Sequence, residues 1–249
     1  SEMCIRDKSG SNDKTIRFWN MHDMSSTRKI SGDGPVSALA TNTAQDELYA
    51  AIGSTIKIFR TTNNIVPIAS LESCIGEISK LLITPDNKHL VYIGSNDAPL
   101  NLINTEKHTL FSCDESAEGT LCALHPQKAI AAVYSKKSQF LRLIKLHDGS
   151  IEATQAVDLD LNSLTFSISG KHIFGATAFL NEDDEDSDYA SFFLVLKTDD
   201  LKKAYTSTVY KGKIINALWH SKSKSLAIIC SDTKSVEFIA RTTLKKQTP

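Results

Sequence analysis

Short apolar segments recur along this chain of 249 residues at a nearly constant interval. Five segments with a similar internal order open at residues 35–39, 77–81, 119–124, 161–166 and 212–219, and the first three intervals are all about 42 residues. Self-similarity at a fixed period is typical of a repeat architecture, in which each unit buries its apolar surface against its neighbours. The period therefore predicts a series of like structural units.

Each unit also contains two further strand patterns. The second segments are short, almost wholly apolar runs, as expected of strands buried on both faces; they are residues 47–53, 89–94, 129–134, 172–178 and 226–230. The third segments are residues 55–59, 100–103, 140–146, 192–196 and 236–239. Turn-forming residues lie between the runs, and no convincing amphipathic helix is present. The pattern predicts an all-β fold.

The stretch from Ser9 to Asn20 is the most distinctive one. It begins with a small, polar corner, in which Asn12 and Asp13 tolerate the backbone angles of a tight turn. Ile16 and Phe18 then alternate with Thr15, Arg17 and Trp19, which places the two sets on opposite faces of a strand. The stretch predicts a strand, a tight turn and a second strand.

This stretch resembles the core of a WD repeat, a unit of about 40 residues that builds one four-stranded blade of a propeller. In that family a turn Asp, a strand Ser or Thr and a strand Trp form a hydrogen-bonded network with a His. Asp13, Ser11 and Trp19 match three of these positions, so the resemblance implies that they are framework residues. No Gly-His pair precedes a first strand, which shortens the expected network. The resemblance implies an all-β, WD40-like β-propeller forming a single domain over residues 1–249.

The number of blades stays open at this point. The start of the chain offers the second to fourth strands of a blade, although Arg6, Asp7 and Lys8 make its outset irregular, and the end stops after a third strand. WD propellers most often have seven blades, which would need about forty residues more. We expect about seven blades, with segments absent from this chain, and six is the alternative. Closure of the ring would leave no exposed sheet edge.

Charge and cysteine content exclude some classes of protein. The net charge is −1, from 28 basic and 29 acidic residues, so no global charge attracts nucleic acid or membranes. Five cysteines are scattered without a CxxC pair, which suits reduced thiols better than disulfides. No apolar run approaches the length of about 20 residues that crosses a bilayer, and no leader opens the chain. We expect an intracellular protein, cytoplasmic or nuclear, without membrane contact.

The histidines do not predict a metal or catalytic site. His125 and His220 end first strands, whereas His89 and His172 begin second strands. Because matching positions of different repeats lie in different sectors of a propeller, we expect these side chains not to converge, and zinc sites need clustered ligands. No nucleophile elbow, phosphate loop or HExxH motif appears. We expect no cofactor, no metal, no catalytic residues and no enzymatic activity.

An acidic insertion at residues 181–189 lengthens the fourth unit to about 51 residues, between its second and third strands. Six of the seven residues from Glu182 to Asp188 are acidic, which favours a solvated loop that buries no apolar surface. The alternative is a docking arm for a basic partner, with Ser187 as a phosphorylation site.

In WD propellers, partners contact the loops between second and third strands and those before first strands. By this resemblance the expected partner-binding residues are Asn12, Asp33, Glu77, Asn96, Glu118, Lys136, Asp184, Lys211 and Asp232. Clusters of lysines, such as Lys136-Lys137, favour ordinary solvated charge, because the interleaved aromatic residues of an RNA-binding surface are missing.

The sequence thus favours a non-catalytic scaffold that holds other protein subunits or peptides on the rim loops of a β-propeller, within a multi-subunit complex. The first alternative is an RNA-binding propeller in RNA processing or ribosome assembly, which would bind RNA in a strongly salt-dependent way. The second is a hydrolase with carboxylates or histidines facing each other in the central channel.

Overall fold

The structure is a computed structural model that describes residues 6–20, 22–62, 64–72, 76–94, 100–112, 119–180, 189–207, 209–220, 225–230 and 235–240. The chain falls into two compact units, Ser1–Cys113 and Asp114–Pro249, each of which is described by itself. All regular elements of the described residues are strands. These residues include no helix with the length and apolar character that a membrane crossing requires. The expectation of a single domain over residues 1–249 stays a prediction.

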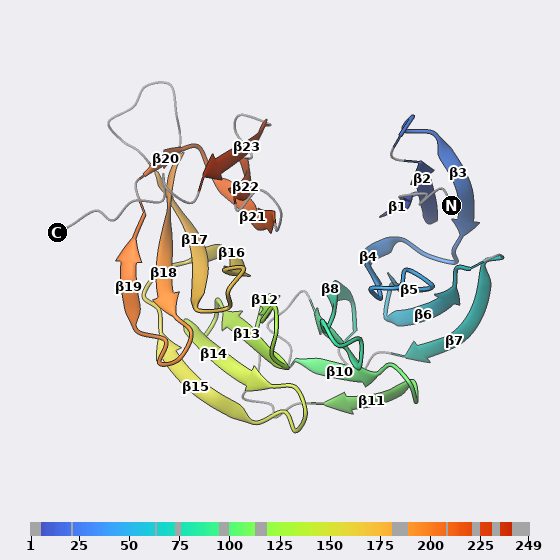
Figure 1. Ribbon diagram of the computed structural model, residues 1–249, viewed down its shortest axis with the longest axis horizontal. Coiled ribbons are helices and arrows are strands. Elements are labelled where there is room, and N and C mark those ends of the chain that lie inside the picture. Colours follow the sequence, from blue (N-terminus) through green and yellow to red (C-terminus); the bar gives the residue numbers. More distant parts are fainter. Residues whose placement is uncertain are drawn as a thin grey trace. The chain divides into compact units, whose positions relative to one another are not determined.

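Unit 1 contains three antiparallel sheets, with the orders β1-β2-β3, β4-β5-β6-β7 and β8-β9-β10-β11 (Figure 1). Its strands are β1 (Arg6–Gly10), β2 (Thr15–Asn20), β3 (Ser26–Ser31), β4 (Val36–Thr41), β5 (Glu47–Ile52), β6 (Thr55–Arg60), β7 (Val66–Glu72), β8 (Ile78–Ile83), β9 (His89–Gly94), β10 (Asn101–Asn104) and β11 (Thr109–Ser112). Consecutive strands are neighbours throughout, so each sheet is a simple meander.

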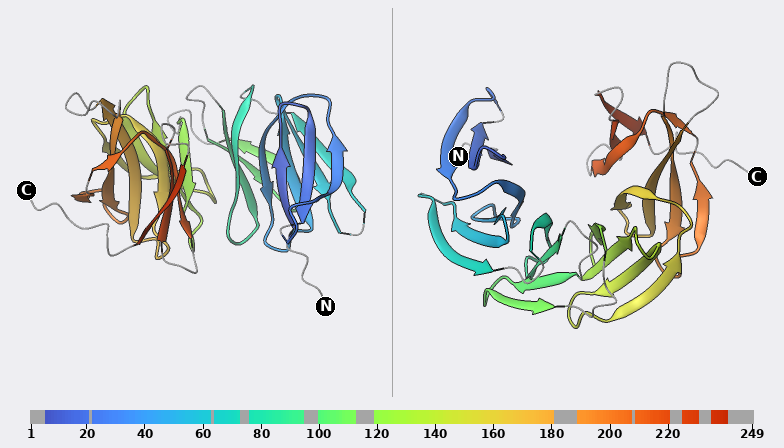
Figure 2. Two further views of the ribbon diagram at one scale, coloured as in Figure 1. Left: turned by 90° about the horizontal axis from the view of Figure 1, so that it is seen from above. Right: turned by 180° about the vertical axis from the view of Figure 1, so that it is seen from behind.

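Unit 2 repeats this topology with the orders β12-β13-β14-β15, β16-β17-β18-β19 and β21-β22-β23, and β20 pairs with β18 (Figures 1 and 2). Its strands are β12 (Leu121–Leu124), β13 (Ile130–Ser135), β14 (Phe140–Lys145), β15 (Ile151–Ala156), β16 (Leu161–Phe166), β17 (His172–Leu180), β18 (Tyr189–Lys197), β19 (Lys203–Thr206), β20 (Tyr210–Lys211), β21 (Ile214–His220), β22 (Ser225–Cys230) and β23 (Ser235–Ala240). The described residues of the two units thus form six antiparallel sheets.

The almost wholly apolar second segments are buried strands, as predicted. Residues 48–52 of β5, 90–94 of β9 and 131–135 of β13 are all buried. They pack on both faces, with Tyr49 and Tyr92 in one cluster of unit 1 and Leu48 and Ala50 in another. Burial on both sides explains why these strands lack the alternation of a half-exposed strand.

Two sheets have three strands each in the described residues. β1 pairs with β2 from Arg6↔Asn20 to Gly10↔Ile16, so the backbone continues the sheet through the charged residues that make this strand irregular in sequence. At the other extreme, the sheet of β21, β22 and β23 ends with the third strand, as the sequence pattern indicates.

The turns of each sheet lie at two opposite ends because its strands run antiparallel. In a four-stranded sheet, one end carries the turns between the first and second strands and between the third and fourth strands, and we call it the AB end. The opposite end, with the turn between the second and third strands, is the BC end. β1, β2 and β3 are counted as second, third and fourth strands, because their first turn is bonded to the connection between β3 and β4. At the AB end, a buried threonine directly after a third strand donates its hydroxyl to a carbonyl of the first turn. The bonds are Thr61 Oγ1 to Gln45 O (2.8 Å), Thr105 Oγ1 to Asn87 O (2.5 Å) and Thr198 Oγ1 to Gly170 O (2.6 Å).

In each case the carbonyl that accepts the threonine hydroxyl belongs to a residue with positive φ, which is 57° for Gln45, 58° for Asn87 and 71° for Gly170. The threonine N–H donates to the next carbonyl along, which ties the two turns by a pair of bonds. In the sheet of β12 to β15, Leu146 replaces the threonine, and only its N–H bond, to Ala129 O, is made. The AB ends are therefore ordered by the same device in successive sheets.

Candidate functional site

The predicted framework residues surround the turn between β1 and β2. The carboxylate of Asp13 accepts hydrogen bonds from the N–H of Thr15 at 2.9 Å and from its hydroxyl at 2.6 Å. Ser11 Oγ accepts the N–H of Asp13 at 3.2 Å. The Thr15 hydroxyl is the main reason why the pKa of Asp13 lies below its ordinary value, with Arg17 as a smaller contribution. These bonds hold the turn in its tight conformation.

Trp19 reaches a different serine from the one that the resemblance indicates. Its indole N–H donates to Ser9 Oγ at 2.8 Å, across the β1–β2 pair, whereas Ser11 serves the turn itself. Ser9 is thus a framework residue that sequence comparison with the WD repeat did not single out. The signal was present, because Ser9 opens the same polar corner as Ser11.

Three expected partner-binding residues lie in unit 1 at BC ends, all of them exposed: Asn12, Asp33 and Glu77. Backbone bonds from Gly32 N to Lys14 O (2.7 Å) and from Val36 N to Ser11 O (3.1 Å) bring the segments of Asn12 and Asp33 together. Asp33 forms an ion pair with Lys57, which lowers the pKa of the aspartate through a hydrogen bond and through charge.

Glu77 is tied in a comparable way to the sheet before it. The hydroxyl of Ser37 in β4 donates to the carbonyl of Ile78, the residue after Glu77, at 2.6 Å. The three predicted positions of unit 1 therefore lie on consecutive sheets whose connections are bonded to one another. Their role in partner binding stays a prediction.

In unit 2, Lys136 is exposed in the turn between β13 and β14, and the backbone of Lys211 pairs with Ala190 of β18. Both positions belong to BC ends, as predicted. The remaining predicted residues, Asn96, Glu118, Asp184 and Asp232, lie outside the described residues, as does the acidic stretch of residues 181–188.

The strands on either side of the acidic stretch form the longest hairpin of unit 2. β17 and β18 pair over nine residues each, from His172↔Lys197 to Leu180↔Tyr189. The pairing with β16 stops at Thr177, so the last three residues of β17 continue beyond it. Phe179, which is 42% exposed, contacts Phe192 with 6.0 Å between ring centroids.

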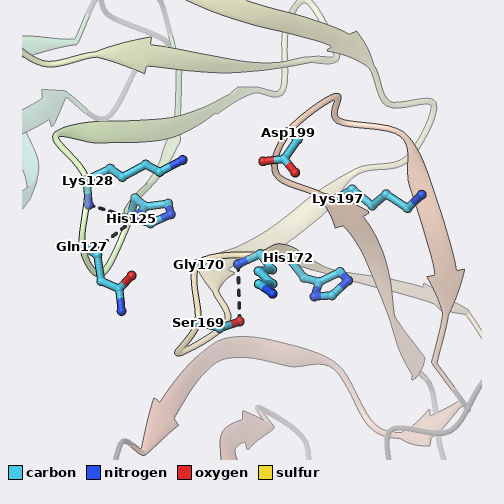
Figure 3. Close-up of a pocket in the computed structure, with 9 residues that line it drawn as sticks. His125, Gln127, Lys128, Ser169, Gly170, His172, Lys197 and Asp199 are labelled. Atoms are coloured by element: carbon cyan, nitrogen blue, oxygen red, sulfur yellow. Dashed lines mark hydrogen bonds between the residues drawn. The ribbon is translucent and has the colours of Figure 1, made fainter.

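A hollow of about 420 Å³ lies at the AB end of unit 2, between the sheet of β12 to β15 and the sheet of β16 to β19. Its volume is within the range of about 300–1,000 Å³ that is usual for small-ligand pockets. Three turns contribute its walls, and the lining residues are His125, Gln127, Lys128, Ser169, Gly170, Lys171, His172, Lys197 and Asp199 (Figure 3).

His125 forms the floor of this AB-end pocket and is only 3% exposed. Its Nδ1 accepts the backbone N–H groups of Gln127 at 3.0 Å and Lys128 at 2.9 Å (Figure 3). A nitrogen that accepts two bonds carries no proton, so the neutral ring is protonated at Nε2. The pKa of His125 lies below its ordinary value of 6.5, mainly because the ring is buried and to a smaller extent because of the charge of Lys128. A hydrogen bond with the Gly170 backbone acts in the opposite direction and raises this pKa, but it is the smallest contribution. The imidazole is therefore uncharged at neutral pH.

Gly170 permits the close approach of the two sheets at this point. A Cβ at this position would lie 2.1 Å from His125 Nε2, and φ is +71°. The His125 ring also packs edge to face on Phe166, with 5.2 Å between centroids. Sheet-to-sheet packing of this kind fixes the turns that line the pocket.

The pocket walls are mainly basic. Lys128, Lys171, Lys197 and Asp199 are all exposed and together give the lining a net charge of +2 with the histidines neutral. Lys128 extends from the β12–β13 turn toward the β16–β17 and β18–β19 turns (Figure 3). The ion pairs between lysine and carboxylate that the structure gives for the described residues involve none of the three pocket lysines.

The pocket brings together two histidines from different repeats. His125 after β12 and His172 at the start of β17 line the same hollow, although they do not occupy matching positions of their sheets. The first turn of one sheet here lies against the first turn of the next. A search of the described residues finds no group of three or more His, Cys, Asp or Glu that could hold a metal ion.

Neither a family model nor a curated protein sequence matches this chain. Solved structures do match, and 1572 chains share the fold. One is a chain of the mitotic checkpoint complex, with a TM-score of 0.77, 14% identity, and coverage of 94% of this chain and 73% of that one. Another is a chain of hydrazine synthase from Kuenenia stuttgartiensis, with a TM-score of 0.75, 14% identity, and coverage of 93% and 75%.

At 14% identity these matches show the fold alone. One of these chains belongs to a protein complex and the other to an enzyme, so the fold by itself does not decide between binding and catalysis. The antiparallel sheets and the structural similarity together confirm the fold class predicted from the sequence: the chain has a WD40-like β-propeller fold.

Proposed function

We propose that this protein is a non-catalytic scaffold that holds other protein subunits or peptides within a multi-subunit complex. The scattered cysteines support a cytoplasmic or nuclear location as part of the proposal. The chain of the mitotic checkpoint complex among the similar structures is compatible with such a role. The single observation that carries the proposal is the hairpin of β17 and β18.

This hairpin presents a charged segment from a braced base. Leu180↔Tyr189 is its last residue pair, so both ends of the acidic stretch start from one point at the BC end. The base is supported on one side by β20, through Ala190↔Lys211 and Ser191↔Tyr210, and Lys213 Nζ lies 5.0 Å from the ring centroid of Tyr189. A fixed base reduces the ordering cost of binding to that of the acidic stretch itself.

The composition of the stretch indicates the partner. Six carboxylates between residues 182 and 188 attract a basic segment, and exposed Phe179 beside Phe192 offers an apolar contact at the base. We therefore expect a partner segment that is rich in Lys or Arg. Attraction of this type acts mainly on the association rate and weakens with salt.

The test replaces the six acidic residues of 182–188 by Asn and Gln at constant length. Affinity-tagged wild type and variant are used to capture proteins from cells at low and at moderate salt, followed by mass spectrometry. Loss of basic partners from the variant supports the proposal. An unchanged set of captured proteins contradicts it. A control with the exposed lysines Lys107 and Lys137 changed to Gln should keep these partners, because it leaves the acidic charge intact.

The predicted partner-binding residues of unit 1 are tested separately. Asp33→Lys combined with Glu77→Lys reverses two exposed charges on connections that lie at BC ends. If these connections bind partners, the double variant loses captured proteins that the acidic-stretch variant keeps. Retention of every partner would remove these two residues from the proposal.

A further inference from the structure

The AB-end pocket of unit 2 has the opposite character to the acidic hairpin. It is concave and basic, and it lies at the other end of the sheet of β16 to β19. The scaffold proposal does not use it. Its volume and its walls from three turns separate it from the lysines that are scattered over flat surface.

We propose that this pocket binds an anionic side chain of a partner peptide, either a phosphorylated serine or threonine or a glutamate or aspartate. Lys128 and Lys171, in the β12–β13 and β16–β17 turns, and Lys197, at the end of β18, supply the positive charge of the lining. An anion in the hollow therefore meets cations from three separate segments of the chain. A lysine ammonium is a point charge with three donors and is well suited to contact phosphate or carboxylate oxygens.

The pocket is built in advance rather than assembled by the ligand. His125 is fixed by two backbone bonds beneath the first turn, and the β18–β19 turn is tied to the β16–β17 turn through Thr198. The two turns and the strand end that carry the three lysines are therefore held at fixed positions. Pre-ordered backbone lowers the entropy cost of binding, while the lysine side chains still have to be ordered.

The net positive charge of the lining favours an anionic ligand. Neutral His125 adds no charge to it. The one carboxylate of the lining, Asp199, opposes the binding of an anion and provides a test of sign. Substitution of Asp199 by Asn removes this repulsion with little change in shape. The structure thus predicts opposite effects for neighbouring lining residues.

The experiment uses fluorescence anisotropy with three labelled peptides of Gly and Ala that differ only at the central residue, which is phosphoserine, Glu or Ala. The whole chain is titrated into each at low salt. We expect binding of the phosphoserine peptide, the Glu peptide or both, and none of the Ala peptide. The first two peptides distinguish phosphate from carboxylate as the preferred group. Equal affinity for all three would overturn the proposal.

Three variants locate the binding. The triple change Lys128→Gln, Lys171→Gln and Lys197→Gln should weaken binding at least tenfold, because it removes all three positive charges of the lysines that line the pocket. The control Lys29→Gln, Lys107→Gln and Lys137→Gln removes the same charge from exposed positions outside the pocket and should keep the affinity. Asp199→Asn should tighten binding.

Equal weakening by both triple variants would show general attraction and overturn the assigned site, and so would looser binding by Asp199→Asn. A short single-stranded RNA that displaces the phosphopeptide from the pocket with a steeper salt dependence would overturn the peptide assignment in favour of nucleic acid. None of these results depends on the acidic hairpin, so failure here leaves the scaffold proposal intact.

Discussion

Substitution of Gly170 by Ala should destabilise unit 2 by about 3 kcal/mol, more than an ordinary glycine replacement in a turn. The left-handed backbone alone costs a residue with a Cβ about 1 kcal/mol. The new Cβ would also lie 2.1 Å from Nε2 of the buried His125, so the ring or the turn must shift. Displacing the ring breaks its bonds to the N–H groups of Gln127 and Lys128, each worth about 1 kcal/mol.

The assay is urea unfolding followed by far-UV circular dichroism. With a denaturant slope of about 2 kcal/mol per molar, a loss of about 3 kcal/mol moves the midpoint by about 1.5 M. Gly53→Ala serves as the comparison, because Gly53 has φ +62° and a Cβ there meets nothing within 4 Å. Gly53→Ala should lower the free energy of unfolding by about 1 kcal/mol, which is the cost of the left-handed backbone alone.

A double-mutant cycle isolates the steric part within unit 2. In a His125→Ala background no ring opposes the new Cβ, so Gly170→Ala should again cost only about 1 kcal/mol, which gives a coupling of about 2 kcal/mol. Independent effects of the two changes, or a Gly170→Ala variant no less stable than Gly53→Ala, would refute the argument that His125 and Gly170 lock the two sheets together.

Three further outcomes are expected. The Asn87 side chain donates a hydrogen bond to Thr43 at 2.6 Å and accepts one from it at 2.9 Å, and Asn87 has φ +58°. In thermal unfolding, Asn87→Gly should lower the free energy of unfolding by about 1–2 kcal/mol through the lost bonds, and Asn87→Ala by about 1 kcal/mol more because alanine disfavours the left-handed backbone. Equal losses for the two variants would contradict the backbone contribution. Trp19→Phe and Ser9→Ala should each destabilise unit 1 by about 1 kcal/mol and should not add, because both remove the same 2.8 Å bond; additive losses in the double variant would argue against it. The pKa of His125 is below 6.5 in the folded protein, so its contribution to the free energy of unfolding is complete above pH 6.5 and is lost as the pH falls through the folded-state pKa. The urea midpoint of the wild type should therefore fall more between pH 7.5 and 5.5 than the midpoint of His125→Asn.

The strands were predictable from the sequence wherever burial fixes the residue type. The apolar run of residues 89–94 became β9, with its residues from Leu90 onward buried, because such a segment has no other place in a folded protein. The second and third strands expected on either side of the acidic insertion are β17 and β18, although β18 already begins at Tyr189, the last residue of the predicted insertion. Local composition decided both cases.

Features that depend on contacts between repeats were not predictable in this way. The chain of β1 carries charged residues that break the pattern, yet it pairs through backbone groups that no residue type encodes. The AB-end pocket draws His125, Lys171 and Lys197 from two sheets, with up to seventy-two positions between them in the chain. A single sequence contains no signal for which turns lie against each other.

The paired hydrogen bonds of the AB ends have a practical consequence for anyone who labels or splices this protein. Adding even one amino acid to the first turn would move the carbonyl of Gln45, Asn87 or Gly170 away from its threonine, whereas the chain between Leu180 and Tyr189 already spans eight extra positions. Fluorophores, epitope tags and inserted modules should therefore be kept away from the threonine-tied corners of the AB ends.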